Sequence, residues 1–312
     1  MKIYTLFREG NFYKGNLHTH TTVSDGKLTP EEVIARYKEN GYSFLGISDH
    51  MFYGHYPQYE DKDFLSIPAA EIHTSENGVA HHLLAFGDPE QTKLTAGKVD
   101  SALNQMDVQS LIDYIRAQRN LVFYCHPYWS RAEIHQVARL ENILGIEIYN
   151  HECEMEWKSG NAEVFFEHLW WHGNRVWCFG TDDAHRSHTF CGGYITVKTD
   201  DFSHRGILKA IKKGSFFASS AREGEEAPKI LDFYCEDGVA KLWCDPCRDV
   251  YFYFGASFDP EIWSYSYKSF HSDQENPITY REQKIPEGTK YVKVSVQDFS
   301  GYNSWCQPIV LK

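Results

Sequence analysis

The sequence predicts an α/β protein with a parallel, barrel-like sheet and a smaller antiparallel β module behind it. Short apolar segments of strand character alternate with helical segments over about 200 residues, and this alternation favours a parallel sheet whose number of strands suggests a barrel. Beyond residue 228, turn residues separate closely spaced strands instead. We therefore expect a barrel over residues 1–222 and a β-rich module over residues 228–312.

The clearest helix boundaries lie between residues 29 and 41. Thr29 is a suitable N-cap, Pro30 suits the first helical position, and Glu32 completes a capping box. Gly41 is a typical helix terminator. We expect strands on both sides of this helix, over residues 16–20 and 43–48.

The rest of the barrel region repeats this alternation. The helix expected over residues 107–119 has the most regular apolar spacing, with Val108, Leu111, Ile112 and Ile115 at i, i+3, i+4 and i+7. Further helices are expected over residues 132–143, 162–172 and 203–213. Strands are expected over residues 67–73, 80–86, 121–125, 145–149, 175–179 and 194–197. In barrels of this kind the working residues lie at the carboxyl ends of the strands.

The region after Pro228 has the alternating pattern of antiparallel strands, most clearly from Tyr291 to Val296. Strands are expected over residues 230–235, 239–244, 250–255 and 291–298. Turn signals separate them, at Asp237-Gly238, Asp245-Pro246 and Glu287-Gly288. A charged, turn-rich segment from Arg222 to Pro228 marks the junction with the barrel.

Charge and hydropathy exclude several classes of partner. The 312 residues carry a formal net charge of −12 without a Lys/Arg stripe, so general binding of duplex nucleic acid is not expected. No apolar run approaches the ~18–20 residues of a membrane helix. The N-terminus has neither a long apolar core nor a small-residue cleavage site, and we expect a cytoplasmic protein.

The eight cysteines are scattered through apolar, strand-like segments, which favours free, buried thiols in a cytoplasmic protein. Cys244 and Cys247 form a lone CxxC pair. A structural zinc knuckle needs a second pair, and none follows. We therefore expect no zinc at these cysteines.

Nine histidine and carboxylate side chains stand at or near the ends of the expected elements. They are His18, His20, Asp25, His50, Glu71, His82, His126, Asp183 and His185. A mixture of imidazole and carboxylate without thiolate suits Zn²⁺, Mn²⁺ or iron better than Ca²⁺, which takes oxygen ligands. Nine ligands exceed the capacity of one ion, so two or three divalent ions are expected.

His81 and His82 compete for one place in this set. Strand alternation sends them to opposite faces, and we prefer His82 because the apolar run 83–86 follows it. His73 and His151 stand near strand ends and are candidates for orienting the ligands. A lone His-x-His or Asp-His pair could also consist of ordinary polar residues on the surface. Only the conjunction of all nine positions favours a metal centre.

The motifs in order resemble those of the PHP (polymerase and histidinol phosphatase) family, in its stand-alone metal-dependent phosphoesterase branch. The resemblance covers roughly residues 14–220 and rests on these motifs: His18-Thr-His20, Ser24-Asp25-Gly26, Thr29-Pro30-Glu31-Glu32, Ser48-Asp49-His50, Ala70-Glu71-Ile72, His126-Pro127 and Asp183-Ala-His185. One departure is Ser48, where threonine is common. The segment from Tyr291 also resembles the β extension behind some PHP domains.

The resemblance implies a distorted seven-stranded (β/α) barrel with a trinuclear metal site that hydrolyses phosphate esters. It makes the nine side chains the ligands. A hydroxide bridging two ions beside Glu71 would be the nucleophile, and an ion near Asp25 and His50 would bind a phosphate oxygen. Glu71, Asp183 and His185 are the expected catalytic residues. Arg186 and Arg222 are candidates for binding the substrate phosphate.

Two other readings stay open at this stage. An amidohydrolase also uses His-x-His, two later histidines and a final aspartate, but the chain lacks an obvious bridging lysine and has the extra pair Asp25 and His50. A metal-bound scaffold without catalysis is the third reading. The expected substrate is a small phosphate ester, among which a sugar phosphate, a nucleotide and a short oligonucleotide are not distinguished. The motifs do not determine whether the substrate is a phosphate monoester or a phosphate diester, and they do not determine the oligomeric state.

Overall fold

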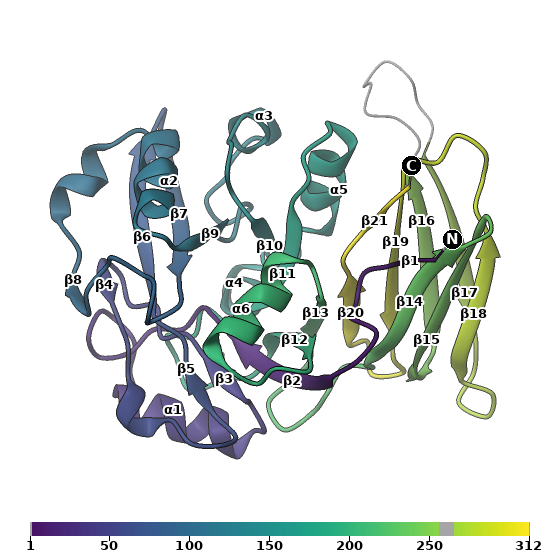
Figure 1. Cartoon of the computed structure of the whole chain (residues 1–312), viewed down its shortest axis with the longest axis horizontal. Helices are drawn as coiled ribbons and strands as arrows, with labels where there is room; N and C mark the ends of the chain where they lie inside the picture. Colours follow the sequence, from purple (N-terminus) through teal and green to yellow (C-terminus); the bar gives the residue numbers. More distant parts are fainter. Residues whose placement is uncertain (1, 256–264, 312) are drawn as a thin grey trace.

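Figure 1 shows the computed structural model of the chain, which describes residues 2–255 and 265–311 and has a mixed α/β architecture. Its two largest sheets contain five strands in the order β11-β10-β9-β7-β6 and ten strands along β17-β16-β19-β20-β13-β12-β2-β3-β5 with β21 beside β19. The mixed α/β class predicted from the sequence is therefore confirmed.

The five-stranded sheet is only partly parallel. Its strands are β6 (Ala69–Glu76), β7 (Val79–Phe86), β9 (Leu121–Tyr124), β10 (Gly145–Asn150) and β11 (Trp177–Thr181). β10 runs parallel to β9 and β11, but β7 is antiparallel to β6 and β9. The all-parallel expectation was wrong here because Asn77 and Gly78 both have positive φ angles, as a two-residue hairpin turn requires.

The ten-stranded sheet begins with strands of the predicted barrel and continues into the C-terminal region. Its strands are β2 (Asn11–Asn16), β3 (Phe44–Leu45), β5 (Leu65–Ser66), β12 (Gly193–Thr199), β13 (Phe216–Ser220), β16 (Asp249–Gly255), β17 (Tyr265–His271), β19 (Tyr291–Gln297), β20 (Asn303–Cys306) and β21 (Ile309–Val310). β2, β3 and β5 are parallel, whereas β12 is antiparallel to β2 and β13.

Two isolated parallel bridges join the sheets, beyond the ends of β2, β3 and β11 and near the start of β6. One connects Thr19 with Ala184, and the other connects His50 with Glu71. The described strands do not form a single closed ladder, so the predicted distorted seven-stranded (β/α) barrel is not confirmed. The bridges nevertheless place predicted ligands from both sheets side by side.

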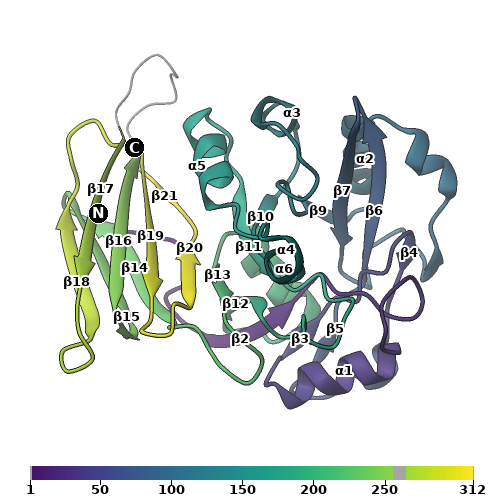
Figure 2. The same ribbon diagram turned by 180° about the vertical axis from the view of Figure 1, so that it is seen from behind.

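Helices lie beside the sheets, as Figures 1 and 2 show. Among the described residues the helices are α1 (Pro30–Glu39), α2 (Val108–Ala117), α3 (Ile134–Ala138), α4 (His151–Trp157), α5 (Glu163–Trp171) and α6 (His204–Lys212), with short 3₁₀ turns η1 (Pro57–Tyr59) and η2 (Ser101–Gln105). The predicted capping box of Thr29 and Glu32 is present. α3 is shorter than expected, and α4 was not predicted. None of the described helices combines the length and apolar content that a membrane span requires.

The C-terminal region is a two-layer β structure, at the right of Figure 1. A four-stranded sheet, β1 (Ile3–Tyr4), β14 (Ile230–Glu236), β15 (Val239–Cys247) and β18 (Ile278–Lys284), packs on the β16–β19 part of the large sheet. Buried apolar side chains from both layers, including Phe233, Leu242, Phe252 and Val294, form one cluster. All eight cysteines are free and buried, as expected. A separate two-stranded sheet pairs β4 (Phe52–Tyr53) with β8 (Gly97–Lys98).

The predicted boundary between residues 222 and 228 does not coincide with a gap in the sheets. β1 from the start of the chain pairs with β14, and β13 pairs with β20. The division into a domain of residues 1–222 and a module of residues 228–312 therefore stays a prediction about independent folding.

A buried charge cluster also ties the two regions together. The Lys293 side chain on β19 is 1% exposed, and its Nζ lies 2.8 Å from Glu163 Oε1 on α5 and pairs with Glu167. It also lies 4.2 Å from the ring centroid of Tyr253. Burial lowers the pKa of Lys293, but the two carboxylates outweigh this and raise the pKa well above its usual value.

Replacing Lys293 should destabilise the whole chain. Lys293→Ala leaves two carboxylates near the interface without their cation, and removing one partner of a buried ion pair costs about 3–5 kcal/mol. We expect urea denaturation to show this loss in the free energy of unfolding. The exposed Lys290→Ala is the matched control on the neighbouring turn, with a change within about 0.5 kcal/mol. Equal stability of the two variants would contradict the structural role of Lys293.

Candidate metal centre

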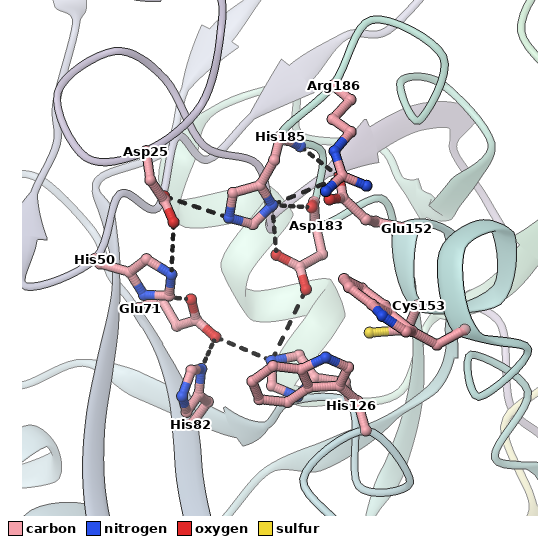
Figure 3. Close-up of a pocket in the computed structure, with 12 residues that line it drawn as sticks. Asp25, His50, Glu71, His82, His126, Glu152, Cys153, Asp183, His185 and Arg186 are labelled. Atoms are coloured by element: carbon pink, nitrogen blue, oxygen red, sulfur yellow. Dashed lines mark hydrogen bonds and ion pairs between the residues drawn. The ribbon is translucent and has the colours of Figure 1, made fainter.

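The structure brings all nine predicted ligands together at the end of the sheets where the two bridges lie. Figure 3 shows the seven of them that line the pocket. The side chains come from Glu71 on β6, His82 on β7, and the segments that follow β2, β3, β9 and β11. They surround a pocket of about 310 Å³, and its walls include Asp25, His50, Glu71, His82, His126, Asp183 and His185. His18 and His20 are fully buried beside them.

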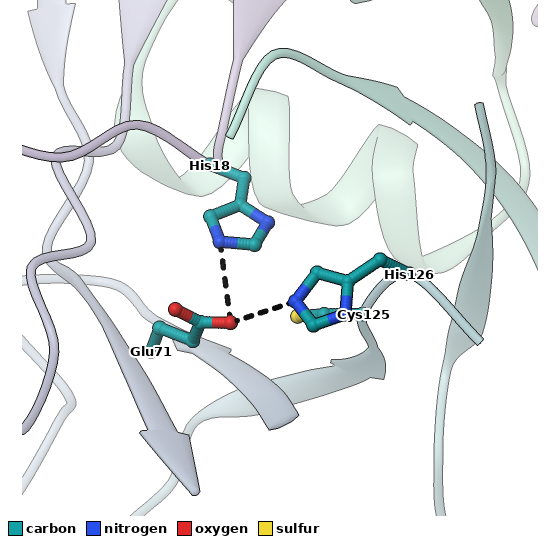
Figure 4. A group of neighbouring side chains, drawn as sticks. All are labelled: His18, Glu71, Cys125 and His126. Carbon is teal, nitrogen blue, oxygen red and sulfur yellow. Dashed lines mark hydrogen bonds and ion pairs between the residues drawn. The ribbon is translucent and has the colours of Figure 1, made fainter. Parts of the chain in front are cut away.

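Glu71 lies at the centre of the cluster, with its side chain 1% exposed. Its Oε1 is 2.7 Å from His82 Nδ1 and 3.1 Å from His126 Nε2. Figure 4 shows His18 and His126 converging on the same oxygen. Its Oε2 is 2.9 Å from His50 Nδ1. Burial raises the pKa of Glu71, but the surrounding imidazoles outweigh this and hold the pKa well below its usual value.

Asp183 faces Glu71 across the two buried histidines. Its Oδ1 lies 3.1 Å from His18 Nε2 and 3.0 Å from His20 Nε2. The backbone aims it there, since Asp183 and His126 both have positive φ angles, +54° and +27°. Non-glycine residues adopt such angles at a cost, and functional sites are where that cost is commonly tolerated.

A further group lies nearer the mouth of the pocket. His185 Nε2 is 3.3 Å from Asp25 Oδ1, and the rings of His185 and His20 stack with centroids 4.0 Å apart. His50 Nε2 lies 3.8 Å from Asp25 Oδ2. The hydrogen bond from His185 holds the pKa of Asp25 well below its usual value, and burial opposes this shift. The Asp25 side chain is 56% exposed, so this group is open to an incoming ligand.

Several buried nitrogen and oxygen atoms of the cluster make no hydrogen bond and are spaced as the ligands of a metal ion would be. In the described part of the chain, five of its atoms are buried without a hydrogen-bond partner: His18 Nε2, His20 Nε2, His50 Nδ1, Glu71 Oε2 and Asp183 Oδ1. Neighbouring pairs among them are 2.9–3.3 Å apart. Ligand atoms with bonds of about 2.1 Å to one ion lie about 3.0 Å apart in octahedral and about 3.4 Å in tetrahedral geometry. The donor set therefore fits divalent ions.

Cys125 is a possible addition to the imidazole and carboxylate set. Its sulfur belongs to a group with His18, Glu71 and His126 whose ligand atoms lie within 4.8 Å of one another (Figure 4). Burial raises the pKa of Cys125 well above its usual value. The side chain is therefore a neutral thiol in the metal-free chain and a weaker candidate than the nine predicted ligands.

Sequence reasoning missed Glu147, which orients the ligands from behind. Its Oε1 accepts hydrogen bonds from Thr181 Oγ1 and lies 2.6 Å from His18 Nδ1, which fixes the imidazole so that Nε2 faces the cluster. Its Oε2 accepts from the backbone N–H of His126 at 2.7 Å and from Asn150. The available signal was an acidic residue inside the apolar strand Gly145–Asn150, where a carboxylate needs a partner.

Glu152 is a second missed residue, and it lies on the unpredicted helix α4. Its Oε2 accepts hydrogen bonds from the backbone N–H of His185 at 2.6 Å and from Thr189 Oγ1 at 2.7 Å. Glu152 also lines the pocket. Nothing in the local pattern of α4 marked this role, because the partners of Glu152 lie more than thirty positions further along the chain.

The other candidate residues have distinct surroundings. His82 lines the pocket, whereas His81 is buried with Nδ1 2.8 Å from the hydroxyl of Tyr124. The ring of His73 lies 5.3 Å from that of His82, and His151 contacts Tyr149 instead of a predicted ligand. Arg186 lines the pocket and pairs with Glu156. Arg222 is exposed and is not among the residues that line this pocket.

Removing the Glu147 carboxylate should weaken metal binding without removing a ligand. We expect Glu147→Gln to lower the affinity of the chain for Mn²⁺ or Zn²⁺ by about 10–100-fold, because partners of this kind orient the ligating histidine. Calorimetric titration of the metal-free chain measures the affinity. The matched control is Glu141→Gln, an exposed position at the start of the loop before β10. Unchanged affinity in Glu147→Gln would exclude this role.

Protons should compete with metal at this site. Burial lowers the pKa of His18, His50 and His126, but the neighbouring carboxylates outweigh this and raise each pKa above its usual value. The metal-free cluster therefore retains protons that bound ions must displace. We expect proton release on metal binding, and weaker binding as the pH falls. Titrations in buffers of different ionisation enthalpy measure the protons released, and a release of none would contradict the expectation.

The chain resembles known proteins in its fold and over part of its sequence. A two-domain protein from Bacteroides vulgatus that contains a predicted PHP-like metal-dependent phosphoesterase has 16% sequence identity, with 94% of this chain and 92% of that chain covered and a TM-score of 0.51. PsfC from Pseudomonas syringae has 14% identity, coverage of 66% and 90%, and a TM-score of 0.46. No curated protein matches the chain. The first likeness shows a shared fold.

The family model of the PHP domain matches residues 16–189 of the chain. The matched segment is more than half of the chain and includes all nine predicted ligands. The chain therefore belongs to the PHP domain family.

Proposed function

We propose that this chain is a metal-dependent phosphoesterase that hydrolyses small phosphate esters. The observation that carries the proposal is the set of unpartnered donor atoms around Glu71 and Asp183, which opens into a pocket of about 310 Å³. The resemblance of the motifs to those of the PHP family supports the same chemistry.

The contacts support a division of the ligands among two or three divalent ions, Mn, Fe or Zn. One group of side chains is His18, His20, Glu71 and Asp183, a second is His50, Glu71 and His82, and a third is His20, Asp25, His50 and His185. His126 groups with His18, Glu71 and Cys125. Glu71, His20 and His50 each belong to more than one group, so adjacent ions would share ligands. When bound, such ions lower the pKa of a coordinated water and offset charge on a phosphoryl group.

The chain itself positions and protects the reacting groups. Glu71 and Asp183 are buried, so little reorganisation is needed when charge develops beside them. Glu147 and Glu152 hold His18 and His185 in place. Of the two predicted phosphate contacts, Arg186 lies at the pocket and is the better candidate. A bidentate clamp on phosphate would require it to exchange its contact with Glu156.

The amidohydrolase reading has less support. A hydroxide centre needs two ions, and the third ligand group around Asp25 provides a place for one more. An ion held there, at the pocket mouth, could bind a phosphate oxygen. Among the described residues that line the pocket, none is a lysine. We also propose that β2, β3, β6, β7, β9, β10 and β11 correspond to the seven strands of a distorted barrel. The bridges Thr19–Ala184 and His50–Glu71 stand where further ladders would close the ring.

Removing Asp183 should abolish hydrolysis. After reconstitution with Mn²⁺, Fe²⁺ or Zn²⁺ we expect two to three ions per chain by elemental analysis and turnover of generic phosphate mono- or diesters. Asp183→Ala should lower kcat by about 100-fold or more, since loss of a ligand should exceed the 10–100-fold effect of its supporting partners. Asp63→Ala, at a side chain 77% exposed, is the control.

Three outcomes would contradict the proposal: fewer than one ion per reconstituted chain, wild-type turnover in Asp183→Ala, or hydrolysis of amide but not phosphate substrates in a shared panel. Circular dichroism of Asp183→Ala separates loss of chemistry from loss of fold.

A further inference from the structure

Two tryptophans at the rim of the pocket have no role in the metal chemistry. Trp129 is 38% exposed and lies in the turn after His126, while Trp157 is 51% exposed and ends α4. Both line the same pocket as Glu71 and Asp183. An exposed apolar side chain is ordinary when it stands alone, but adjacent large ones at a pocket indicate a binding surface.

The two rings extend outward from the ligand cluster. The Trp129 ring lies 4.9 Å from that of His126 and 5.5 Å from that of His82, between ring centroids. The Trp157 ring follows at 6.3 Å from that of Trp129, with an angle of 63° between their planes. The pair therefore forms an aromatic corner, which begins at the histidines and ends in solvent.

Charge in the pocket limits what can bind beyond the reacting phosphate. Among the described lining residues, Arg186 is the one lysine or arginine, and it pairs with Glu156. Glu152 adds negative charge to the same wall. The described lining residues therefore offer no row of cationic side chains to a second phosphate or to a long polyanion. The volume of about 310 Å³ lies at the small end for ligand pockets, which favours one small, largely uncharged group beside the phosphate.

We propose that Trp129 and Trp157 form a subsite for a flat heteroaromatic ring in the alcohol part of the phosphate ester. This inference rests on the proposed phosphoesterase function and names the substrate class. Two sources supply the chemistry: the base of a nucleoside phosphate, and another ring-bearing ester such as pyridoxal 5′-phosphate.

Stacking gives the physical basis. A flat ring placed against an indole buries apolar area on both partners, and offset or edge-to-face geometry adds quadrupole attraction. A corner of two rings contacts a flat group by face and by edge at once. Such stacking tolerates different bases because each presents a π face. The subsite therefore selects for an aromatic ring and not for a particular arrangement of hydrogen-bonding groups on that ring.

Tyr128 provides a matched control for these tryptophans. It precedes Trp129 and is 39% exposed, nearly the same as its neighbour. Its ring, however, contacts Phe165 of α5 at 5.7 Å and 86°, and it is not among the residues that line the pocket. Tyr128→Ala therefore removes an equally exposed aromatic ring from the same turn without touching the subsite.

The experiment compares two phosphate esters of the primary 5-hydroxyl of ribose, one with a base and one without. Adenosine 5′-monophosphate and ribose 5-phosphate have chemically similar leaving groups but differ in the base, so the ratio of their kcat/KM values isolates the ring. If the chain proves to be a diesterase, a dinucleotide and its abasic counterpart replace them. Pyridoxal 5′-phosphate and glucose 6-phosphate complete the panel. The variants are Trp157→Ala, Trp157→Phe and Trp129→Phe, with Tyr128→Ala as control.

The wild-type ratio should favour adenosine monophosphate, and Trp157→Ala should lower it by about 5- to 140-fold. This range corresponds to about 1–3 kcal/mol per stacked base at 1.4 kcal/mol per tenfold change. The loss should appear mainly in KM. Trp157→Phe should restore part of the ratio, and Tyr128→Ala should leave it unchanged. A preference for pyridoxal phosphate alone or for the nucleotide alone identifies the source, and both outcomes support the subsite.

The subsite would be overturned, with phosphoesterase activity intact, if neither adenosine monophosphate nor pyridoxal 5′-phosphate were preferred over its ring-free counterpart. A ring preference that Trp157→Ala leaves unchanged, or a Trp157-dependent preference for glucose 6-phosphate, would overturn it as well. If none of the esters is hydrolysed, calorimetry of the metal-reconstituted chain with adenosine and with ribose decides the question. Binding of adenosine that is weakened in Trp157→Ala supports the subsite although the proposed function has failed. Absence of such binding overturns the subsite.

Discussion

The structure depends on one unusual constraint, a buried carboxylate that is surrounded by imidazoles from four parts of the chain. Glu71 contacts His50, His82 and His126 within 3.1 Å, and Asp183 brings a second carboxylate close to the same buried histidines. Each carboxylate disfavours ionisation of the other, and burial penalises both. Protons on His18, His50 and His126, whose pKa values the carboxylates raise, offset this charge in the metal-free chain, and divalent cations would do so more completely. The nine side chains of the cluster therefore suit the binding of cations better than they suit a hydrophobic core, as the proposed function requires.

The two sheets are arranged so that this cluster can form. β6 and β7 carry Glu71 and His82 as neighbouring strands of a hairpin, while the bridges at Thr19 and His50 bring the ends of β2 and β3 against the other sheet. Sharp backbone turns at His126 and Asp183 complete the convergence. Behind the ligands, Glu147 bonds to a ligand side chain, a ligand backbone and two supporting polar groups. Rigidity at the centre thus comes from hydrogen bonds that never face the pocket.

The pocket divides into a charged floor and an aromatic rim, and the two parts have different origins. The floor comes from Glu71 and His82 within β6 and β7 and from the segments that follow β2, β3, β9 and β11, whose positions the sheets fix. The rim comes from the turn after β9 and from the end of α4, which belong to connections between strands. Such connections vary more easily than the strands they join. The C-terminal region joins the rest of the chain through the Lys293 ion pairs with α5 and the β13–β20 pairing. It contributes none of the described residues that line the pocket.

The sequence by itself determined the nine candidate ligands, the capping of α1, most strand positions and the change to β structure near residue 222, because each is a local pattern of spacing, caps or turns. It could not determine that β6 and β7 pair in antiparallel fashion, that β13 continues into β20, or that Glu147 and Glu152 support His18 and His185. These depend on which strands become neighbours, and the partners are brought together by packing between distant segments. The aromatic corner of Trp129 and Trp157 is of the same kind. Nothing in either local sequence distinguishes a core tryptophan from one that faces the pocket, and only the tertiary structure placed both beside the candidate metal ligands.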